Sequence, residues 1–269
     1  LDLVGGVRWD FLRLKALQGD TPPAQRRDYS TWTGFLGFSF KIREEIIAFA
    51  NLSKAYRAPG PSELFYTGIT GRGMIISQPG LKPETSRNLD GGLKFIFKRW
   101  FLGLYSFYYE IDDLIERYLL DPAQRIYTYG NIDQGKINGY EVELEYYPLQ
   151  GWKIFGNFLS FTGKSKITEN PLNDIPAQRI YFGTRLWIGR FSTEINTTLQ
   201  QSQNNPGPAE IEIPGYGVVN LKASYFFRQN LRLYFTLSNL LDKFYLARPD
   251  PDGIENPGRN LIIGASYSF

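Results

Sequence analysis

Apolar and polar residues alternate along many stretches of the chain, and the alternation is clearest over residues 261–269. One face of this stretch is apolar throughout, with Leu261, Ile263, Ala265, Tyr267 and Phe269. A period of two indicates a β-strand whose two faces meet different environments. Aromatic residues at the end of an apolar face are typical of a transmembrane barrel, where they lie at the membrane interface. The alternative is the last strand of a soluble sandwich.

The same pattern predicts twelve strands, most of them about nine to fifteen residues long. They span residues 1–11, 31–42, 46–56, 84–97, 100–118, 125–146, 152–162, 179–188, 191–200, 216–227, 231–245 and 261–269. The phase is lost at residues 12–14, where we expect the first strand to end. Sandwich strands are usually about five or six residues long. The predicted strands are nearer the length that crosses a bilayer at a tilt.

The predicted connections alternate between short and long. The short turns are 43–45, 98–99, 148–151, 189–190 and 228–230, and the longer loops are 15–30, 57–83, 119–124, 163–178, 201–214 and 246–257. Aromatic residues gather beside the short turns, as at Trp100, Trp152 and Trp187. Bacterial outer-membrane barrels have this arrangement, with the short turns in the periplasm. Both chain ends are then expected on the periplasmic side.

Residues 140–146 distinguish a barrel from a sandwich. Apolar residues at 140, 142, 144 and 146 alternate with Glu141, Glu143 and Glu145. A sandwich would bury the glutamates or expose the apolar residues, whereas a barrel places lipid outside and water or a polar plug inside. The chain is therefore predicted to be all-β, an antiparallel transmembrane β-barrel, with residues 1–269 forming one outer-membrane barrel domain.

Composition narrows the function. The 269 residues include no Cys and no His, which removes disulfides, thiolate chemistry, the usual general base and the usual zinc ligand. The net charge of +3 is too balanced to indicate nucleic-acid binding. No apolar run is long enough for a transmembrane helix. These observations favour a non-enzymatic protein without a cofactor or bound metal.

Six short segments, taken in order, resemble one family. They are Gly6-Val7-Arg8-Trp9-Asp10, Ala55-Tyr56-Arg57-Ala58-Pro59 with Glu63-Leu64, Leu81-Lys82-Pro83-Glu84-Thr85, Ile137-Asn138-Gly139-Tyr140-Glu141-Val142-Glu143, Asn239-Leu240-Leu241-Asp242-Lys243-Phe244-Tyr245, and Pro257-Gly258-Arg259 before the terminal strand. Together they resemble the C-terminal part of the barrel of a TonB-dependent outer-membrane receptor.

The resemblance implies a bacterial outer-membrane location and a barrel of about 22 strands, of which the twelve predicted here are roughly the second half. It implies an N-terminal plug domain, missing from this sequence, that binds TonB. The expected function is active uptake of a scarce metal chelate, such as a ferric siderophore or a similar iron complex, or of cobalamin. The alternative is a passive porin formed by a self-contained barrel of twelve strands. A membrane-embedded hydrolase ranks below both, because the chain has no His.

Two groups of residues are candidates for binding. Tyr66, Arg72 and Met74 in a long loop, with Tyr127 and Tyr129 near the end of a strand, are expected to contact ligand at the outer mouth. Packing against neighbouring loops or the plug is the alternative for the loop residues. Glu141, Glu143, Glu145, Glu194 and Asn196 are expected to line the lumen. The three glutamates there either pair with basic residues of the plug or form a solvated wall.

Acidic residues in and after a Pro-Asp-Pro-Asp-Gly segment resemble part of a calcium-binding loop. Asp250, Asp252 and Glu255 have partial spacing that prolines interrupt, so an Asx turn is the favoured interpretation. The six predicted loops together carry a charge of about −2, so they form no basic funnel for an anionic chelate.

Overall fold

Most of the chain forms a single β-sheet. The computed structural model describes residues 1–16, 26–228 and 230–268, and only the backbone at 132–133. The long strands follow chain order, each antiparallel to the next. They are β1 (Asp2–Lys15), β2 (Arg26–Arg43), β3 (Ile46–Arg57), β6 (Glu84–Ile96), β7 (Trp100–Asp121), β8 (Ile126–Tyr146), β9 (Trp152–Ser165), β10 (Arg179–Ile188), β11 (Phe191–Gln200), β12 (Tyr216–Arg228), β13 (Leu231–Ser238) and β14 (Asn260–Tyr267).

Three short elements lie in the connection between β3 and β6. They are helix α1 (Pro61–Phe65) and the hairpin of β4 (Gly68–Thr70) and β5 (Gly73–Ile76). Among the described residues, no helix is both long and apolar enough to cross a membrane.

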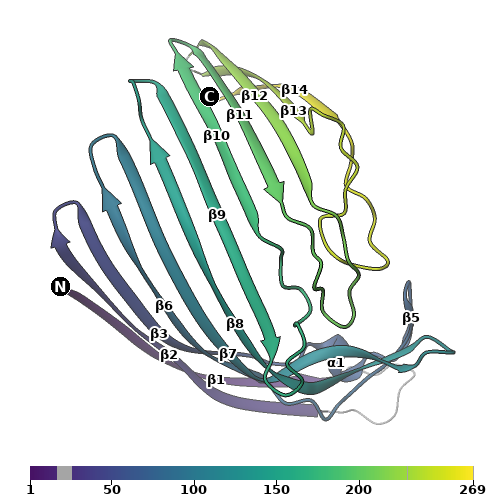
Figure 1. The fold of residues 1–269 in the computed structure, drawn as a ribbon. Helices are drawn as coiled ribbons and strands as arrows, with labels where there is room; N and C mark the ends of the chain where they lie inside the picture. The colour runs from purple at the N-terminus through teal and green to yellow at the C-terminus, as the bar shows by residue number, and fades with distance from the viewer. Residues whose placement is uncertain (17–25, 229, 269) are drawn as a thin grey trace.

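The sheet curves like the wall of an incomplete cylinder (Figure 1). The short turns and both chain ends lie at one end of the strands, and the long connections, α1 and β5 gather at the other. The predicted separation into a short-turn rim and a long-loop rim is therefore confirmed.

Burial is inverted relative to a soluble domain. The convex side, here the outer face, carries apolar side chains that are open to the surroundings, such as Val7 at 82% exposed and Ile263 at 73%. Glu194 and Asn196, on the opposite inner face, are only 5% and 3% exposed. A single sheet with lipid outside and polar groups inside accounts for both observations, and no second layer covers the outer face of the described strands. The predicted barrel architecture is confirmed, and the sandwich is excluded.

The sheet is open. β1 and β14 stand at its two edges and do not pair with each other. The self-contained barrel of twelve strands would require that pairing, so the described sheet is part of a barrel rather than a closed one.

The predicted end of the strand before the terminal one is wrong by seven residues. The strand expected over 231–245 ends at Ser238, because Asn239 has a positive φ of 51° and turns the chain. The Asn239 side chain accepts a hydrogen bond from the Lys243 amide at 2.9 Å and donates to the Lys243 carbonyl at 2.8 Å. Asparagine tolerates this backbone conformation and replaces the strand's hydrogen bonds with those of a compact turn.

Further boundaries differ near the long-loop rim: β2 starts at Arg26 instead of 31, and β9 ends at Ser165 instead of 162. β1 continues to Lys15 because residues 12–15 pair with residues 26–29 of β2, so the loss of apolar phase does not end the strand. The loop expected at 119–124 is a short turn, because β7 and β8 extend together as a tall hairpin to Asp121 and Ile126. Phe269, the last residue of the predicted terminal strand, and residues 17–25 of the predicted loop 15–30 lie outside the described residues.

Aromatic rings cover glycines on the inner face. A Cβ atom added at Gly139 would lie 2.5 Å from the Phe107 ring on the neighbouring strand, and one at Gly103 would lie 2.4 Å from the Tyr105 hydroxyl. Each ring therefore rests against bare backbone, which only glycine offers.

Candidate ligand vestibule and lumen wall

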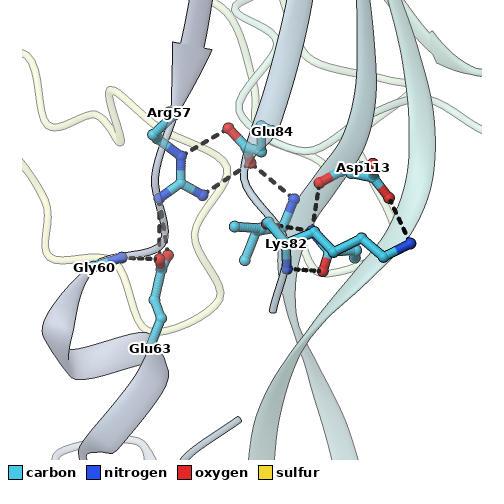
Figure 2. A network of polar contacts seen from close by, with 8 residues as sticks. Arg57, Gly60, Glu63, Lys82, Glu84 and Asp113 are labelled. Atoms are coloured by element: carbon cyan, nitrogen blue, oxygen red, sulfur yellow. Dashed lines mark hydrogen bonds and ion pairs between the residues drawn. The ribbon is translucent and has the colours of Figure 1, made fainter. Parts of the chain in front are cut away.

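The long connection between β3 and β6 is held to the rim by one arginine. Arg57, the last residue of β3, donates to both carboxylate oxygens of Glu84 at 2.7 and 2.8 Å and to Glu63 of α1 at 3.1 Å (Figure 2). Glu63 in turn accepts from the Gly60 amide at 2.6 Å, which closes the first turn of α1. The hydrogen bonds that Arg57 donates to the carboxylate of Glu84, and then to that of Glu63, raise the pKa of the guanidinium. The charge that fixes α1 is therefore permanent.

Backbone contacts extend this anchor to the β7–β8 hairpin. Glu84 accepts from the Ile115 amide at 2.8 Å, and Asn131 bonds both the amide and the carbonyl of Lys82 at 2.8 and 2.9 Å. Beneath these bonds, Leu64, Leu81 and Ile115 form a small buried cluster. The connection is thus a fixed part of the long-loop rim.

The β4–β5 hairpin docks on the tall β7–β8 hairpin. β5 pairs in parallel with the start of β8, which places Met74 beside Ile126 and Ile75 beside Tyr127. The Met74 amide also donates to the Arg125 carbonyl at 3.1 Å. Segments about 50 residues apart in sequence therefore form one surface at the mouth.

A cavity of about 480 Å³ lies where four connections meet at the long-loop rim. Its lining comes from the β4–β5 turn, the upper parts of β7 and β8, and the connections that follow β9, β11 and β13. Charged and aromatic residues in the lining include Arg72, Arg117, Tyr129, Glu210 and Arg248. The lining is mixed in charge, because three arginines stand beside four acidic residues, Glu116, Asp174, Glu210 and Asp250.

Arg72 joins the first half of the chain to the second across this cavity. It pairs with Asp250, and its Nε lies 3.5 Å from Asp252. Asp250 also accepts from the Asp252 amide at 3.0 Å, so the predicted Asx turn is present. Among the described residues no group of acidic side chains is arranged to hold a metal ion. Two of the carboxylates that resembled calcium ligands, Asp250 and Asp252, instead pair with Arg72.

The predicted mouth residues separate into two sets. Arg72 and Tyr129 line the cavity together. Tyr66, Met74 and Tyr127 do not line it: Tyr66 is 44% exposed and donates to the Ile69 carbonyl at 3.1 Å, Met74 is 39% exposed, and the Arg117 guanidinium lies over the Tyr127 ring at 5.1 Å.

The predicted lumen residues all lie on the inner face. Glu143 accepts from the Tyr105 hydroxyl at 3.4 Å, and Glu145 pairs with Lys153 and accepts from the Tyr147 hydroxyl at 2.9 Å. Glu141 lies on the same row and is directly opposite Tyr105 in the strand register. The glutamate row is thus partly neutralised by the wall itself.

Glu194 and Asn196 belong to a chain of polar contacts across three strands. Glu194 pairs with Arg185 and lies 3.6 Å from Lys222. Asn196 donates to Glu194 at 2.8 Å and accepts from Asn220 at 3.0 Å. The Asn239 amide donates to Asn220 at 3.0 Å, so the network runs up to the turn that ends β13.

Sequence reasoning missed several residues of these sites. Arg117 and Arg248 of the cavity carried no local signal, because their lining role depends on connections far apart in sequence. Arg57, Glu63 and Glu84 stood only within motifs of the family resemblance. Their arrangement around one guanidinium was not predicted.

An inside-out antiparallel sheet with a polar inner wall and a mouth built from long connections defines an outer-membrane β-barrel of the transport class. Residues 1–240 match the family model described as TonB dependent receptor-like, beta-barrel. The chain therefore belongs to the TonB-dependent receptors, a family of bacterial outer-membrane receptors and transporters.

Relatives and solved structures agree with this membership. The chain is 30% identical to heme/hemopexin utilization protein C of Haemophilus influenzae (strain 86-028NP), over 89% of this chain and 36% of that protein. It is 26% identical to ferric enterobactin receptor PirA of Pseudomonas aeruginosa, over 93% of this chain and 39% of that protein. The solved structure of the copper transporter OprC superposes with a TM-score of 0.85 at 22% identity, over 99% of this chain and 45% of that one. The chain thus spans less than half the length of these relatives.

Proposed function

We propose that the chain is the C-terminal part of the barrel of a receptor that actively takes up a scarce metal chelate. The candidate ligands are a ferric siderophore or similar iron complex, haem included, and cobalamin. The observation that carries the proposal is the cavity of about 480 Å³ at the long-loop rim. Its volume is within the range that holds a small molecule, and it opens where the inner face of the sheet begins.

Names of relatives support the substrate class. They include a heme/hemopexin utilization protein, ferric enterobactin receptors and a vitamin B12 transporter. Haem, ferric enterobactin and vitamin B12 are all metal complexes. A receptor for such a ligand needs a mouth that recognises it and a wall that admits it.

Within the cavity, we assign ligand contact to Arg72, Tyr129, Arg117 and Arg248. Arg248 is exposed and forms no ion pair with any described residue, so it is available to an anionic chelate. Tyr129 provides a ring against which an aromatic or catechol group can pack. Tyr66, Met74 and Tyr127 lie on the surrounding surface, where ligand would touch them on its approach.

The inner face is assigned to the plug. Glu141, Glu143, Glu145, Glu194 and Asn196 form the polar wall that a plug domain would contact, and Lys222, 54% exposed, adds a cation beside Glu194. We propose that an N-terminal plug domain binds this wall and transmits force from TonB, so that uptake requires energy. In this assignment residues 1–269 are one portion of a single barrel domain of about 22 strands, and the chain catalyses no reaction.

Uptake by cells tests the proposal. Cells that express the native receptor are given radiolabelled iron as haem, as ferric enterobactin or as another ferric chelate, and labelled cobalamin, with and without functional TonB. We expect uptake of at least one of these ligands, lost when TonB is absent. Arg248→Gln and Arg117→Gln should each raise the concentration for half-maximal uptake about ten-fold or more. Arg43→Gln, at the short-turn rim, is the matched control.

Two results would overturn the assignment. TonB-independent accumulation together with steady ionic conductance in a planar bilayer would indicate a passive pore. Equal effects of Arg248→Gln and Arg43→Gln on ligand affinity would show that the cavity does not bind the ligand.

A further inference from the structure

A row of charged side chains crosses five neighbouring strands on the outer face. The register places Lys54 of β3 opposite Arg87 of β6, Arg87 opposite Glu110 of β7, Glu110 opposite Lys136 of β8, and Lys136 opposite Lys164 of β9. Four of these five positions are basic. Because side chains directly opposite each other in a sheet share a face, the five form one continuous row.

Exposed apolar neighbours confirm that the row lies on the outer face. Leu52 and Leu89, two residues from Lys54 and Arg87 on the same strands, are 58% and 46% exposed. Between the row and the short turns these five strands carry no charged residue on the outer face. The outward positions there are Ile46, Ala48, Ala50, Leu52, Leu89, Gly91, Leu93, Phe95, Phe97, Trp100, Leu102, Leu104, Ser106, Tyr108, Asn138, Tyr140, Val142, Leu144, Tyr146, Trp152, Ile154, Gly156, Phe158, Ser160 and Thr162.

The height of the row matches the edge of the membrane. Lys54 lies eight residues from Ile46 at the start of β3, and Lys164 lies twelve residues from Trp152 at the start of β9. With a rise of about 3.3 Å per residue and a tilt of about 45°, these distances correspond to roughly 19 to 28 Å. The apolar band of an outer-membrane barrel is about 25 Å tall. The row therefore runs obliquely across the outer edge of the apolar band, from Lys54 below that edge to Lys164 above it, and long basic side chains let it reach the headgroups of the external leaflet.

The charges of the row are largely available. Lys54, Lys136 and Lys164 form no ion pair with any described residue; the Lys54 ammonium lies 4.0 Å from the centre of the Trp32 ring, and that of Lys136 lies 5.1 Å from the Tyr108 ring. Arg87 is 75% exposed and forms a long ion pair, of 3.9 Å, with Asp112. The one acidic member, Glu110, is already paired with Lys166 at 2.8 Å.

An amphipathic groove runs down from one end of the row. A shallow, open hollow of about 420 Å³ on this side of the sheet is lined by Lys54, Arg87 and Glu110 at the charged level, by Trp32 on its long-loop side, and by Leu36, Leu52 and Leu89 toward the apolar band. Gly34, opposite Lys54, leaves the space between Val7 and Lys54 unfilled. A free anion would use only the charged end, whereas a lipid would use both ends.

We infer that the outer face of β3 and β6–β9 is a binding site for a lipid of the external leaflet whose headgroup carries two phosphates. Lys54 and Arg87 form one cationic pair, and Lys136 and Lys164 form the other. The two pairs are about three strand spacings apart, roughly 14 Å, so each can bind one phosphate of an extended headgroup. An acyl chain occupies the groove beside Leu52 and Leu89. The strands β10–β14 carry no such row on their described outward positions, so the site faces one side of the protein.

Lipid retention by the native outer-membrane protein tests this inference. The protein is purified in mild detergent, delipidated, and titrated with phosphatidylethanolamine vesicles containing lipid A with two phosphates, with one phosphate, or none. We expect tightest binding to the bisphosphorylated form. The variant K54Q/R87Q/K136Q/K164Q should bind it at least about 100-fold more weakly, since each basic residue at a membrane surface contributes about five-fold.

Two matched variants separate charge from folding. K41Q/R43Q/K98Q/R99Q removes the same number of positive charges at the short-turn rim and should bind as the unmodified protein does. K54R/K136R/K164R keeps the charges and should retain binding. Equal loss in the two glutamine variants, loss in the arginine variant, or indifference to the phosphate number would each overturn the inference. Displacement of the lipid by equimolar inorganic phosphate would assign the row to a free anion instead and would also overturn it. None of these readouts depends on ligand uptake, so their failure is distinct from failure of the transport proposal.

Discussion

Arg72 and Asp250 form an ion pair although 178 residues separate them in sequence. Arg72 lies in the turn of the β4–β5 hairpin, and Asp250 lies in the connection between β13 and β14. The pair closes one side of the cavity at the long-loop rim, which we call the vestibule, by joining the β4–β5 turn to the β13–β14 connection. It makes the shape of the vestibule depend on both halves of the chain.

Breaking this pair should loosen both connections without unfolding the sheet. Both side chains are about one-third exposed, so we expect Arg72→Gln to cost at most about 1 kcal/mol. That corresponds to roughly five-fold faster amide exchange at residues 68–76 and 246–257. Hydrogen exchange with mass spectrometry measures this change. Arg72→Gln and Asp250→Asn should have non-additive effects in a double-mutant cycle, and additive effects would contradict a direct coupling.

Arg57 should not be replaceable by lysine. Lysine keeps the charge but cannot bind Glu84 through two parallel N–H groups while also reaching Glu63. We expect Arg57→Lys to release α1, with faster proteolysis within residues 61–80 and loss of about 1 kcal/mol of local stability. Limited proteolysis of the folded protein reports this. Arg43→Lys, at the opposite rim, should leave the cleavage pattern unchanged; if Arg57→Lys also leaves it unchanged, another contact holds α1.

Glu194 should be the most sensitive carboxylate of the inner wall. It is 5% exposed and contacts Arg185, Lys222 and Asn196. Glu194→Gln weakens charge-assisted hydrogen bonds and should lower the free energy of unfolding by about 1.5 to 3 kcal/mol. Urea unfolding of the protein in lipid vesicles measures the difference. Glu141→Gln, the same substitution on the same face, should change it by less than about 0.5 kcal/mol, and a comparable loss there would argue against the network.

A new positive charge should destabilise the protein far more at one position of β7 than at the position next to it. Leu104 faces outward near the middle of the apolar band, and Tyr105 faces inward beside Glu143. Leu104→Lys should destabilise the protein in a bilayer by about 2 to 4 kcal/mol. Tyr105→Lys should cost less, because its ammonium lies in a polar wall. Equal losses for the two variants in a vesicle-based unfolding assay would show that the faces are assigned wrongly.

Local alternation was sufficient to predict the strands and the two rims. At residues 140–146 each side chain meets either lipid or the polar interior, so the sequence itself carries the period. Asn239 shows where this reasoning fails, because the apolar pattern continues through 240 and 241 while the backbone has already turned. The tall β7–β8 hairpin likewise extends beyond the membrane, where neither face is required to be apolar.

The vestibule was much less predictable than the wall. Arg72 and Tyr129 were expected at the mouth as separate residues. Their shared cavity with Arg117 and Arg248 arises only when four connections converge. Contacts of this kind depend on long-range closure rather than on any local period. The acidic Pro-Asp-Pro-Asp-Gly segment demonstrates the same limit, since the arginine that binds it lies in a distant hairpin.

The glycines beneath aromatic rings on the inner face also set the width of any passage. Because Phe107 rests against Gly139 and Tyr105 against Gly103, these large rings lie close along the wall instead of projecting toward the axis. Alanine at Gly103, where the three nearest atoms all belong to the Tyr105 side chain, would lift that ring away from the backbone and narrow the bore. The smallest side chains of the sheet thereby determine how bulky a cargo, or how thick a plug, the finished cylinder can hold.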